Sequence, residues 1–147
     1  MTIPYHVFVY GTLKPGERYY EQFCAPYVIE KQDAIAPGRL YDLSVGYPGM
    51  TIEEGQVLGV RLTFTDEVVL ARLDALEEFF PDRPEDSEYQ RLERPLLTPK
   101  HEPLGLAWAY IMTPERVKSL QGLWLPSGHW SRRNLSVEPN QMHKDMS

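Results

Sequence analysis

Hydrophobic residues in this chain follow two different spacings, and the change between them constrains the fold. Within residues 65–80, apolar side chains recur every three or four positions, which predicts one helix. Short apolar runs separated by turn residues flank that segment and predict strands at residues 7–10, 27–36, 39–43, 57–64, 89–97 and 104–112. Strands thus cluster before and after a central helix, without regular alternation. This order predicts an α+β fold with a mostly antiparallel or mixed sheet, a small barrel being one form of it.

Proline and glycine divide the chain into these elements. Pro37-Gly38 is expected to end the second extended run, residues 46–50 are expected to form a turn, and Pro81 should stop the helix. Shorter helices are expected at residues 18–24 and 115–123. The length of 147 residues suits one domain, which we place at residues 1–131, followed by a polar C-terminal tail at residues 132–147.

Composition excludes several functional classes. The net charge of -6 argues against a nucleic-acid partner, and no apolar run is long enough to span a membrane. The first residues lack the pattern of a signal peptide, and the single cysteine, Cys24, allows no internal disulfide and no multi-cysteine metal site. We therefore expect a cytoplasmic protein without a metal. The sequence does not give the oligomeric state.

One acidic residue lies on the apolar side of the predicted helix. With Leu73 at the centre of the apolar stripe, Glu77 falls roughly 40° away, whereas Glu78 points roughly 140° away, toward water. A carboxylate that faces the interior must be paired, hydrogen-bonded or protonated, and burial raises its pKa toward the range of a general acid or base.

A structural role for Glu77 is the alternative. The residue would then form a buried ion pair or lie at the edge of the stripe. The candidate partners are Arg39, Arg61 and Arg91.

A second candidate feature follows the first predicted strand. Tyr10 is followed directly by Gly11, which allows the backbone to approach a ligand closely, and consecutive amides in such a turn can bind an anion. The alternative is an ordinary turn. The spacing of a Walker phosphate-binding loop is absent.

Taken together, these segments resemble the gamma-glutamylcyclotransferase-like family, in the family's order and over roughly residues 6 to 112. The motifs that carry the resemblance are Tyr10-Gly11-Thr12-Leu13, Gly38-Arg39-Leu40-Tyr41 with Tyr47-Pro48, Val57-Leu58-Gly59-Val60, Leu73-Asp74-Ala75-Leu76-Glu77, Tyr89-Gln90-Arg91 and Ala107-Trp108-Ala109-Tyr110.

The resemblance implies a small mixed, partly closed barrel-like sheet with a few flanking helices and a cavity at one end. It implies a small-molecule γ-glutamyl substrate, an amine or dipeptide, whose own α-amine attacks its γ-carbonyl and releases 5-oxoproline without a cofactor. Glu77 would be the catalytic acid and base. Substrate would be held by the backbone amides of Gly11, Thr12 and Leu13 in a cavity lined by Tyr10 and Tyr89.

The chain departs from the family pattern after Glu77. Glu78 stands where the family often has glycine, and the loop to Glu88 is longer and more acidic, which would favour a cationic leaving amine such as a lysine-type amine. Two other functions stay open: a catalytically silent module that binds a small anionic metabolite, and a hydrolase of a related amide. A cysteine nucleophile is not indicated, since no histidine partner is suggested for Cys24.

Overall fold

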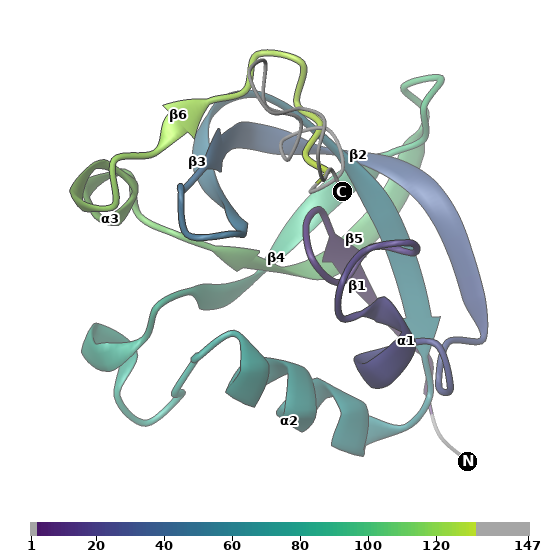
Figure 1. The fold of residues 1–147 in the computed structure, drawn as a ribbon. Helices are drawn as coiled ribbons and strands as arrows, with labels where there is room; N and C mark the ends of the chain where they lie inside the picture. The colour runs from purple at the N-terminus through teal and green to yellow at the C-terminus, as the bar shows by residue number, and fades with distance from the viewer. Residues whose placement is uncertain (1–2, 132–147) are drawn as a thin grey trace, which may run out of the picture.

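A computed structural model describes residues 3–131 of this chain, so the expected tail at residues 132–147 lies outside the described residues. Figure 1 shows the elements in chain order. They are β1 (Tyr5–Val9), α1 (Tyr20–Phe23), β2 (Glu30–Asp42), β3 (Pro48–Phe64), α2 (Glu67–Leu76), the short 3-10 turn η1 (Pro84–Asp86), β4 (Gln90–Leu97), β5 (Pro103–Ile111), α3 (Pro114–Ser119) and β6 (Leu123–Trp124).

Five strands close into a barrel, which confirms the α+β fold with a mixed barrel-like sheet. Their order is β3-β1-β5-β4-β2, and pairing of β2 with β3 completes the ring. The sheet is mixed because β1 runs parallel to β5, whereas the other neighbouring pairs are antiparallel. The short β6 pairs with the end of β2.

Strand β1 is buried on both faces from Val7 to Val9. Val7 and Val9 pack in a layer that also contains Val69 and Leu73 of α2. Phe8 and Tyr10 alternate with them and pack against residues of the other barrel strands, inside the ring. The layer of α1 and α2 on one side of the barrel is visible in Figure 1. No helix among the described residues is long and apolar enough to cross a membrane.

One turn expectation was wrong, and a second holds only in part. Pro37-Gly38 does not end the strand, because β2 continues through a bulge between Pro37 and Arg39. Gly38 has φ 153°, and a Cβ there would lie 2.5 Å from the carbonyl oxygen of Thr51 on β3. The segment 46–50 is only partly a turn, since β3 already begins at Pro48. Pro37-Gly38 thus marks a bulge within β2, and Gly46 lies in the bend that connects β2 to β3.

The helices begin within two residues of the expected positions and end earlier than expected. Asp66 caps α2 by accepting from the Val68 N–H at 3.0 Å, but the helix stops at Leu76 and not at Pro81. Glu78 has φ 55°, a left-handed conformation that a helix cannot continue. Helix α3 ends at Ser119.

Candidate active site

A cavity of about 260 Å³ lies where β1, the β2–β3 loop, the end of α2 and the start of β4 meet. The structure brings together in it all six residues that the sequence analysis proposed for the site. They are Tyr10, Gly11, Thr12, Leu13, Glu77 and Tyr89. The roles assigned to them stay predictions, whereas their shared position is a finding.

The glycine turn presents backbone to this cavity. The Lys14 N–H donates to the Gly11 carbonyl at 3.0 Å, and the Tyr19 N–H donates to the Thr12 carbonyl at 2.8 Å, so both carbonyls are occupied within the loop. No described residue accepts a hydrogen bond from the amides of residues 11–13. A Cβ on Gly11 would lie 2.6 Å from Cγ of Pro48, which explains the need for glycine. Unoccupied amides at a cavity wall suit an anion or a developing oxyanion.

Glu77 and Glu78 lie in different environments, as the helical wheel predicts. Glu77 is the C-cap of α2 and its N–H donates to the Leu73 carbonyl at 2.9 Å, so it still follows the helical path of the buried Leu73. Its side chain is half-buried and lines the cavity. Glu78 is exposed and has a positive φ of 55°, and it also borders the cavity, which the helical wheel did not predict.

The Glu77 carboxylate has no hydrogen bond and no ion pair with any other residue in the range 3–131. The three arginines considered as its partners each pair with a different acid: Arg39 with Glu53 at 4.0 Å, Arg61 with Glu30 at 3.5 Å and Arg91 with Asp74 at 2.7 Å. Burial, together with the negative charges of Glu78 and Glu88, raises the pKa of Glu77 to about 8. Such a group can accept and return a proton near neutral pH.

Two buried tyrosines form fixed walls of the cavity. The Tyr10 hydroxyl donates to the Tyr110 carbonyl at 2.6 Å, and the Tyr89 hydroxyl donates to the Pro48 carbonyl at 2.7 Å. Burial raises the pKa of both hydroxyls well above the ordinary value, and the nearby charge of Glu77 adds to the effect. Both tyrosines therefore stay neutral, and their donated protons hold the β1 end and the β2–β3 loop in place.

The sequence analysis missed several residues that line the cavity. Glu88 accepts from Arg116 at 2.6 Å and from the Tyr47 hydroxyl at 3.3 Å. Arg18 also lines the cavity, is exposed and lies 5.1 Å from the ring of Tyr19. The acidic loop and the Tyr-Pro motif pointed to Glu88 and Tyr47, whereas no sequence signal indicated Arg18.

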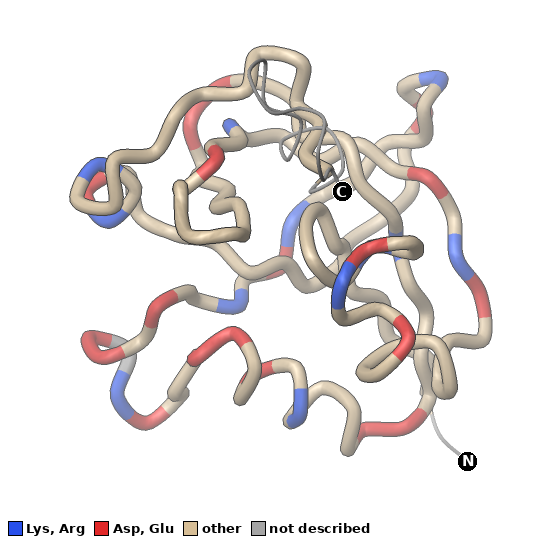
Figure 2. Tube along the Cα trace, in the orientation of Figure 1, with Lys and Arg blue, Asp and Glu red and all other residues tan. Residues whose placement is uncertain are grey.

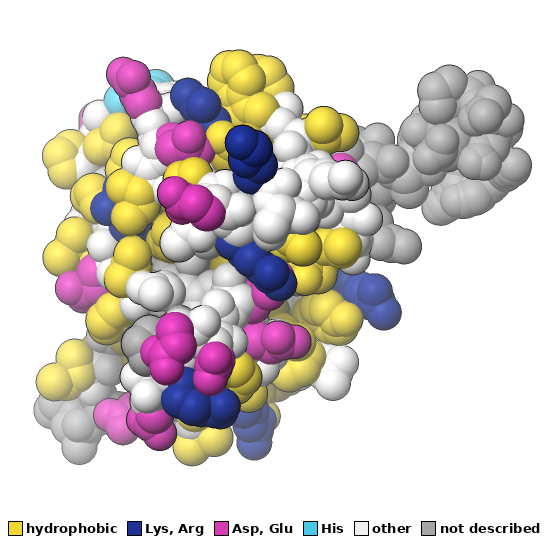
Figure 3. All heavy atoms as spheres, turned by 90° about the vertical axis from the view of Figure 1, so that its left-hand side faces the viewer, with side chains coloured by type: hydrophobic (Ala, Val, Ile, Leu, Met, Phe, Trp, Pro, Cys, Tyr) yellow, Lys and Arg dark blue, Asp and Glu magenta, His cyan; other side chains and the backbone are white. Residues whose placement is uncertain are grey.

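Acidic positions gather between the end of α2 and β4, as the tube in Figure 2 shows. Figure 3 views a face on which acidic and basic side chains lie close together in the lower part. Glu78 and Glu88 belong to this segment and line the cavity beside Glu77, where Arg18 is a basic lining residue and Glu88 is paired with Arg116.

The remaining candidates give no second site. Cys24 is buried and burial raises the pKa of its thiol to about 12, so the thiolate that a nucleophile requires is disfavoured. Within residues 3–131, no group of three or more histidine, cysteine or acidic residues is arranged to hold a metal ion.

Comparisons with known proteins agree on one family. The sequence model of the family described as "Gamma-glutamyl cyclotransferase, AIG2-like" matches residues 7–132. A putative gamma-glutamylcyclotransferase from Vibrio cholerae is 33% identical over 128 residues, which are 86% of this chain and 96% of that protein.

Two further relatives extend the comparison. The gamma-L-glutamyl-butirosin B gamma-glutamyl cyclotransferase of Niallia circulans is 32% identical over 106 residues, and the match covers 72% of this chain but only 65% of that protein. The crystal structure of an AIG2-like protein from Mus musculus superposes with a TM-score of 0.65 at 19% identity and covers 98% of both chains. This last similarity concerns the fold.

Proposed function

We propose that this protein, which belongs to the AIG2-like gamma-glutamyl cyclotransferase family, cyclises the γ-glutamyl part of an amine or dipeptide and releases 5-oxoproline. The observation that carries the proposal is the Glu77 carboxylate, which has a raised pKa, no described partner and a place in the same cavity as the glycine turn. The family makes the chain a gamma-glutamyl cyclotransferase-like enzyme. The substrate, the product and the role of Glu77 are the proposal.

The first step is attack of the substrate's α-amine on its own γ-carbonyl carbon. The ionised Glu77 takes a proton from the α-ammonium group and leaves a nucleophilic amine. A new C–N bond then closes a five-membered ring. Because the nucleophile belongs to the substrate, the protein has to fold the substrate and move protons, and it needs no nucleophile of its own.

The second step is collapse of the tetrahedral intermediate. Attack leaves the ring nitrogen with an extra proton and a positive charge. The proton held by Glu77 passes to the departing nitrogen, the bond between the γ-carbon and that nitrogen breaks, and the extra proton of the ring nitrogen passes through the Glu77 carboxylate to the released amine. The products are 5-oxoproline and an ammonium ion, and Glu77 is ionised again, so atoms and charges balance without water or a cofactor. The amides of Gly11, Thr12 and Leu13 would hold the oxyanion of the intermediate, because these amides donate to no described residue.

The acidic residues around the cavity bear on the leaving amine. Glu78 lines the cavity beside Glu77 without a described ion pair, whereas Glu88 is paired with Arg116, so Glu78 is the acid that supports the expectation of a cationic leaving amine. The substrate panel for the test therefore contains γ-glutamyl amides with lysine-type, neutral and anionic leaving groups.

The test is to incubate purified protein with this panel and to quantify 5-oxoproline and glutamate. We expect 5-oxoproline, its loss in Glu77→Gln with an unchanged circular dichroism spectrum, and retained turnover in Glu78→Gln, which keeps the proposed acid and base and removes only a neighbouring charge. Release of glutamate would favour a hydrolase, and binding without either product would favour a silent module. Equal loss from both substitutions would contradict the assignment to Glu77.

A further inference from the structure

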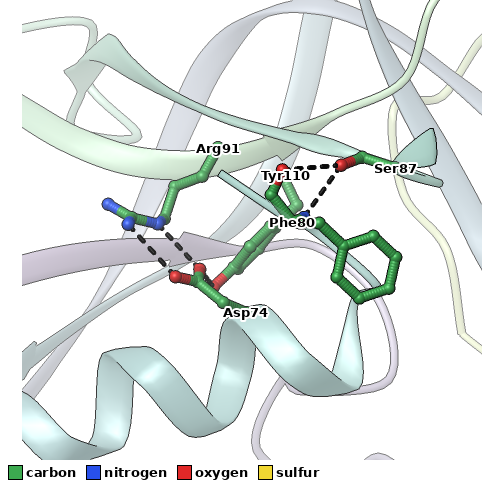
Figure 4. Close-up of polar contacts among 5 residues, drawn as sticks. All are labelled: Asp74, Phe80, Ser87, Arg91 and Tyr110. Atoms are coloured by element: carbon green, nitrogen blue, oxygen red, sulfur yellow. Dashed lines mark hydrogen bonds and ion pairs between the residues drawn. The ribbon is translucent and has the colours of Figure 1, made fainter. Parts of the chain in front are cut away.

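Asp74 and Glu77 lie three residues apart at the C-terminal end of α2, but their surroundings differ. Glu77 has no described partner, whereas Asp74 is held by two strands of the barrel. Arg91 of β4 binds it in a bidentate manner, with Nε 2.7 Å from Oδ1 and Nη2 3.1 Å from Oδ2. The Tyr110 hydroxyl of β5 donates to the same Oδ1 at 2.7 Å. Figure 4 shows the three side chains converging between the helix and the sheet.

Arg91 is itself fixed by two aromatic rings. Its guanidinium lies 4.7 Å from the ring centre of Trp108 and 5.5 Å from that of Phe79. The side chains of Arg91 and Asp74 are only 17% and 13% exposed. The planar guanidinium of Arg91 forms two parallel bonds, a fork, that fixes the orientation of the Asp74 carboxylate as well as pairing its charge. A lysine cannot form both bonds.

The network also reaches the other wall of the cavity. Tyr110 lines the cavity, and its carbonyl accepts the hydroxyl proton of Tyr10 at 2.6 Å. Tyr10 directly precedes the glycine turn. One residue of β5 therefore contacts, through its hydroxyl, the helix that carries Glu77 and, through its carbonyl, the residue before Gly11.

The chain on the far side of Glu77 is fixed separately. The Phe80 N–H donates to Oγ of Ser87 at 2.8 Å, and the Glu88 N–H donates to the Glu78 carbonyl at 2.9 Å. These bonds close the acidic loop on itself, as the Phe80–Ser87 contact in Figure 4 illustrates. Asp74 is the polar side chain that ties the last turns of α2 to the barrel.

We propose that Asp74, Arg91 and Tyr110 are positioning residues that hold the end of α2 against the barrel, so that the Glu77 carboxylate faces the glycine turn. This inference rests on the proposed function of Glu77 and assigns a task to residues outside the reacting groups. A misplacement of about 1 Å at a catalytic group can cost about 100-fold in rate, so a network of this geometry affects turnover without touching substrate.

The decisive variant is Arg91→Lys, because it removes the fork and keeps the charge on every group around Glu77. We expect kcat to fall by about 10- to 100-fold with KM changed by less than about threefold. We also expect the pKa of Glu77 to fall toward its ordinary value, measured by NMR titration of 13C-labelled glutamate, because the carboxylate swings into water. Tyr110→Phe removes one bond of the network and should show the same changes at smaller size.

Arg61→Lys is the matched control. Arg61 is also a largely buried arginine, 12% exposed, that bonds a carboxylate on a neighbouring strand, and it does not line the cavity. We expect it to change neither kcat nor the Glu77 titration, even if it lowers the melting temperature as much as Arg91→Lys does. Equal kinetic effects of the two substitutions, or an unchanged kcat and Glu77 pKa in Arg91→Lys, would overturn the inference.

Failure of the proposed function gives a different result. If Glu77→Gln keeps full turnover, Glu77 is not the acid and base. The NMR titration of Arg91→Lys then still decides whether the network positions Glu77, because it requires no substrate.

Discussion

Glu77 should weaken the fold at neutral and higher pH, and Glu77→Gln should therefore stabilise it. The folded protein has a Glu77 pKa of about 8, compared with the ordinary value of 4.5. Between these values the folded state binds one more proton than the unfolded state, so the free energy of unfolding falls as pH rises. The stabilising contribution of protonated Glu77 is fully present below pH 4.5 and is lost as the pH rises through about 8.

The size of the effect follows from the difference of about 3.5 between the two pKa values. At about 1.4 kcal/mol for each tenfold change in proton affinity, the upper bound is roughly 5 kcal/mol. Water can enter the cavity and relax the penalty, so we expect Glu77→Gln to gain about half of this bound, about 2–3 kcal/mol, at pH 9. At pH 4.5 the two proteins should differ by less than about 0.5 kcal/mol, because neither side chain is charged in the folded state.

Urea unfolding at pH 4.5, 7 and 9 measures this difference. With a slope of about 1–3 kcal/mol per molar urea, the expected gain moves the midpoint by about 1 M at pH 9. Glu78→Gln is the control, and we expect less than about 0.5 kcal/mol because Glu78 is exposed. Parallel pH profiles for wild type and Glu77→Gln would refute the claim that burial of this carboxylate is costly.

Two further predictions concern turnover. The value of kcat/KM should rise with pH up to about 8, because Glu77 must be ionised in the free protein. The corresponding rise in kcat should lie at lower pH, because the bound α-ammonium group favours the ionised carboxylate. Stopped assays across pH 5–10 check both predictions. Gly11→Ala should lower kcat by about 10- to 100-fold, because its Cβ would lie 2.6 Å from Pro48 and must displace the turn. Gly16→Ala meets nothing within 4 Å but stands at φ 89°, so it strains the backbone of the same loop and should lower stability while keeping kcat within about threefold. Equal losses of kcat would show that the Pro48 contact does not matter.

The local parts of the fold were predictable because their causes are local. Asp66 and the apolar spacing up to Leu73 define α2 from a dozen residues, and the same spacing separates Glu77 from Glu78. Strand β1 was predictable because a strand buried on both faces is continuously apolar. These patterns require no knowledge of what the segment packs against.

Features that depend on a distant partner were not predictable in the same way. Pro37-Gly38 has the composition of a turn, and only the backbone of β3 against Gly38 shows that it is a bulge within a continuous strand. The early end of α2 depends on the left-handed conformation of Glu78. Glutamate rarely adopts this conformation, so the residue type at position 78 does not predict it.

The partner of Arg91 illustrates the limit most clearly, and it also explains the site. The sequence offered Arg91 as a partner for Glu77, but the spacing of residues cannot decide whether the arginine meets Glu77 or Asp74, three residues earlier. In the structure the fork of Arg91 and the hydroxyl of Tyr110 both go to Asp74. Because Asp74 takes both partners, Glu77 borders the cavity without either of them. The ion-paired Asp74 fixes the end of the helix. The unpaired Glu77 keeps the high proton affinity that the proposed chemistry requires, and Glu77→Gln would reveal the cost of this in stability.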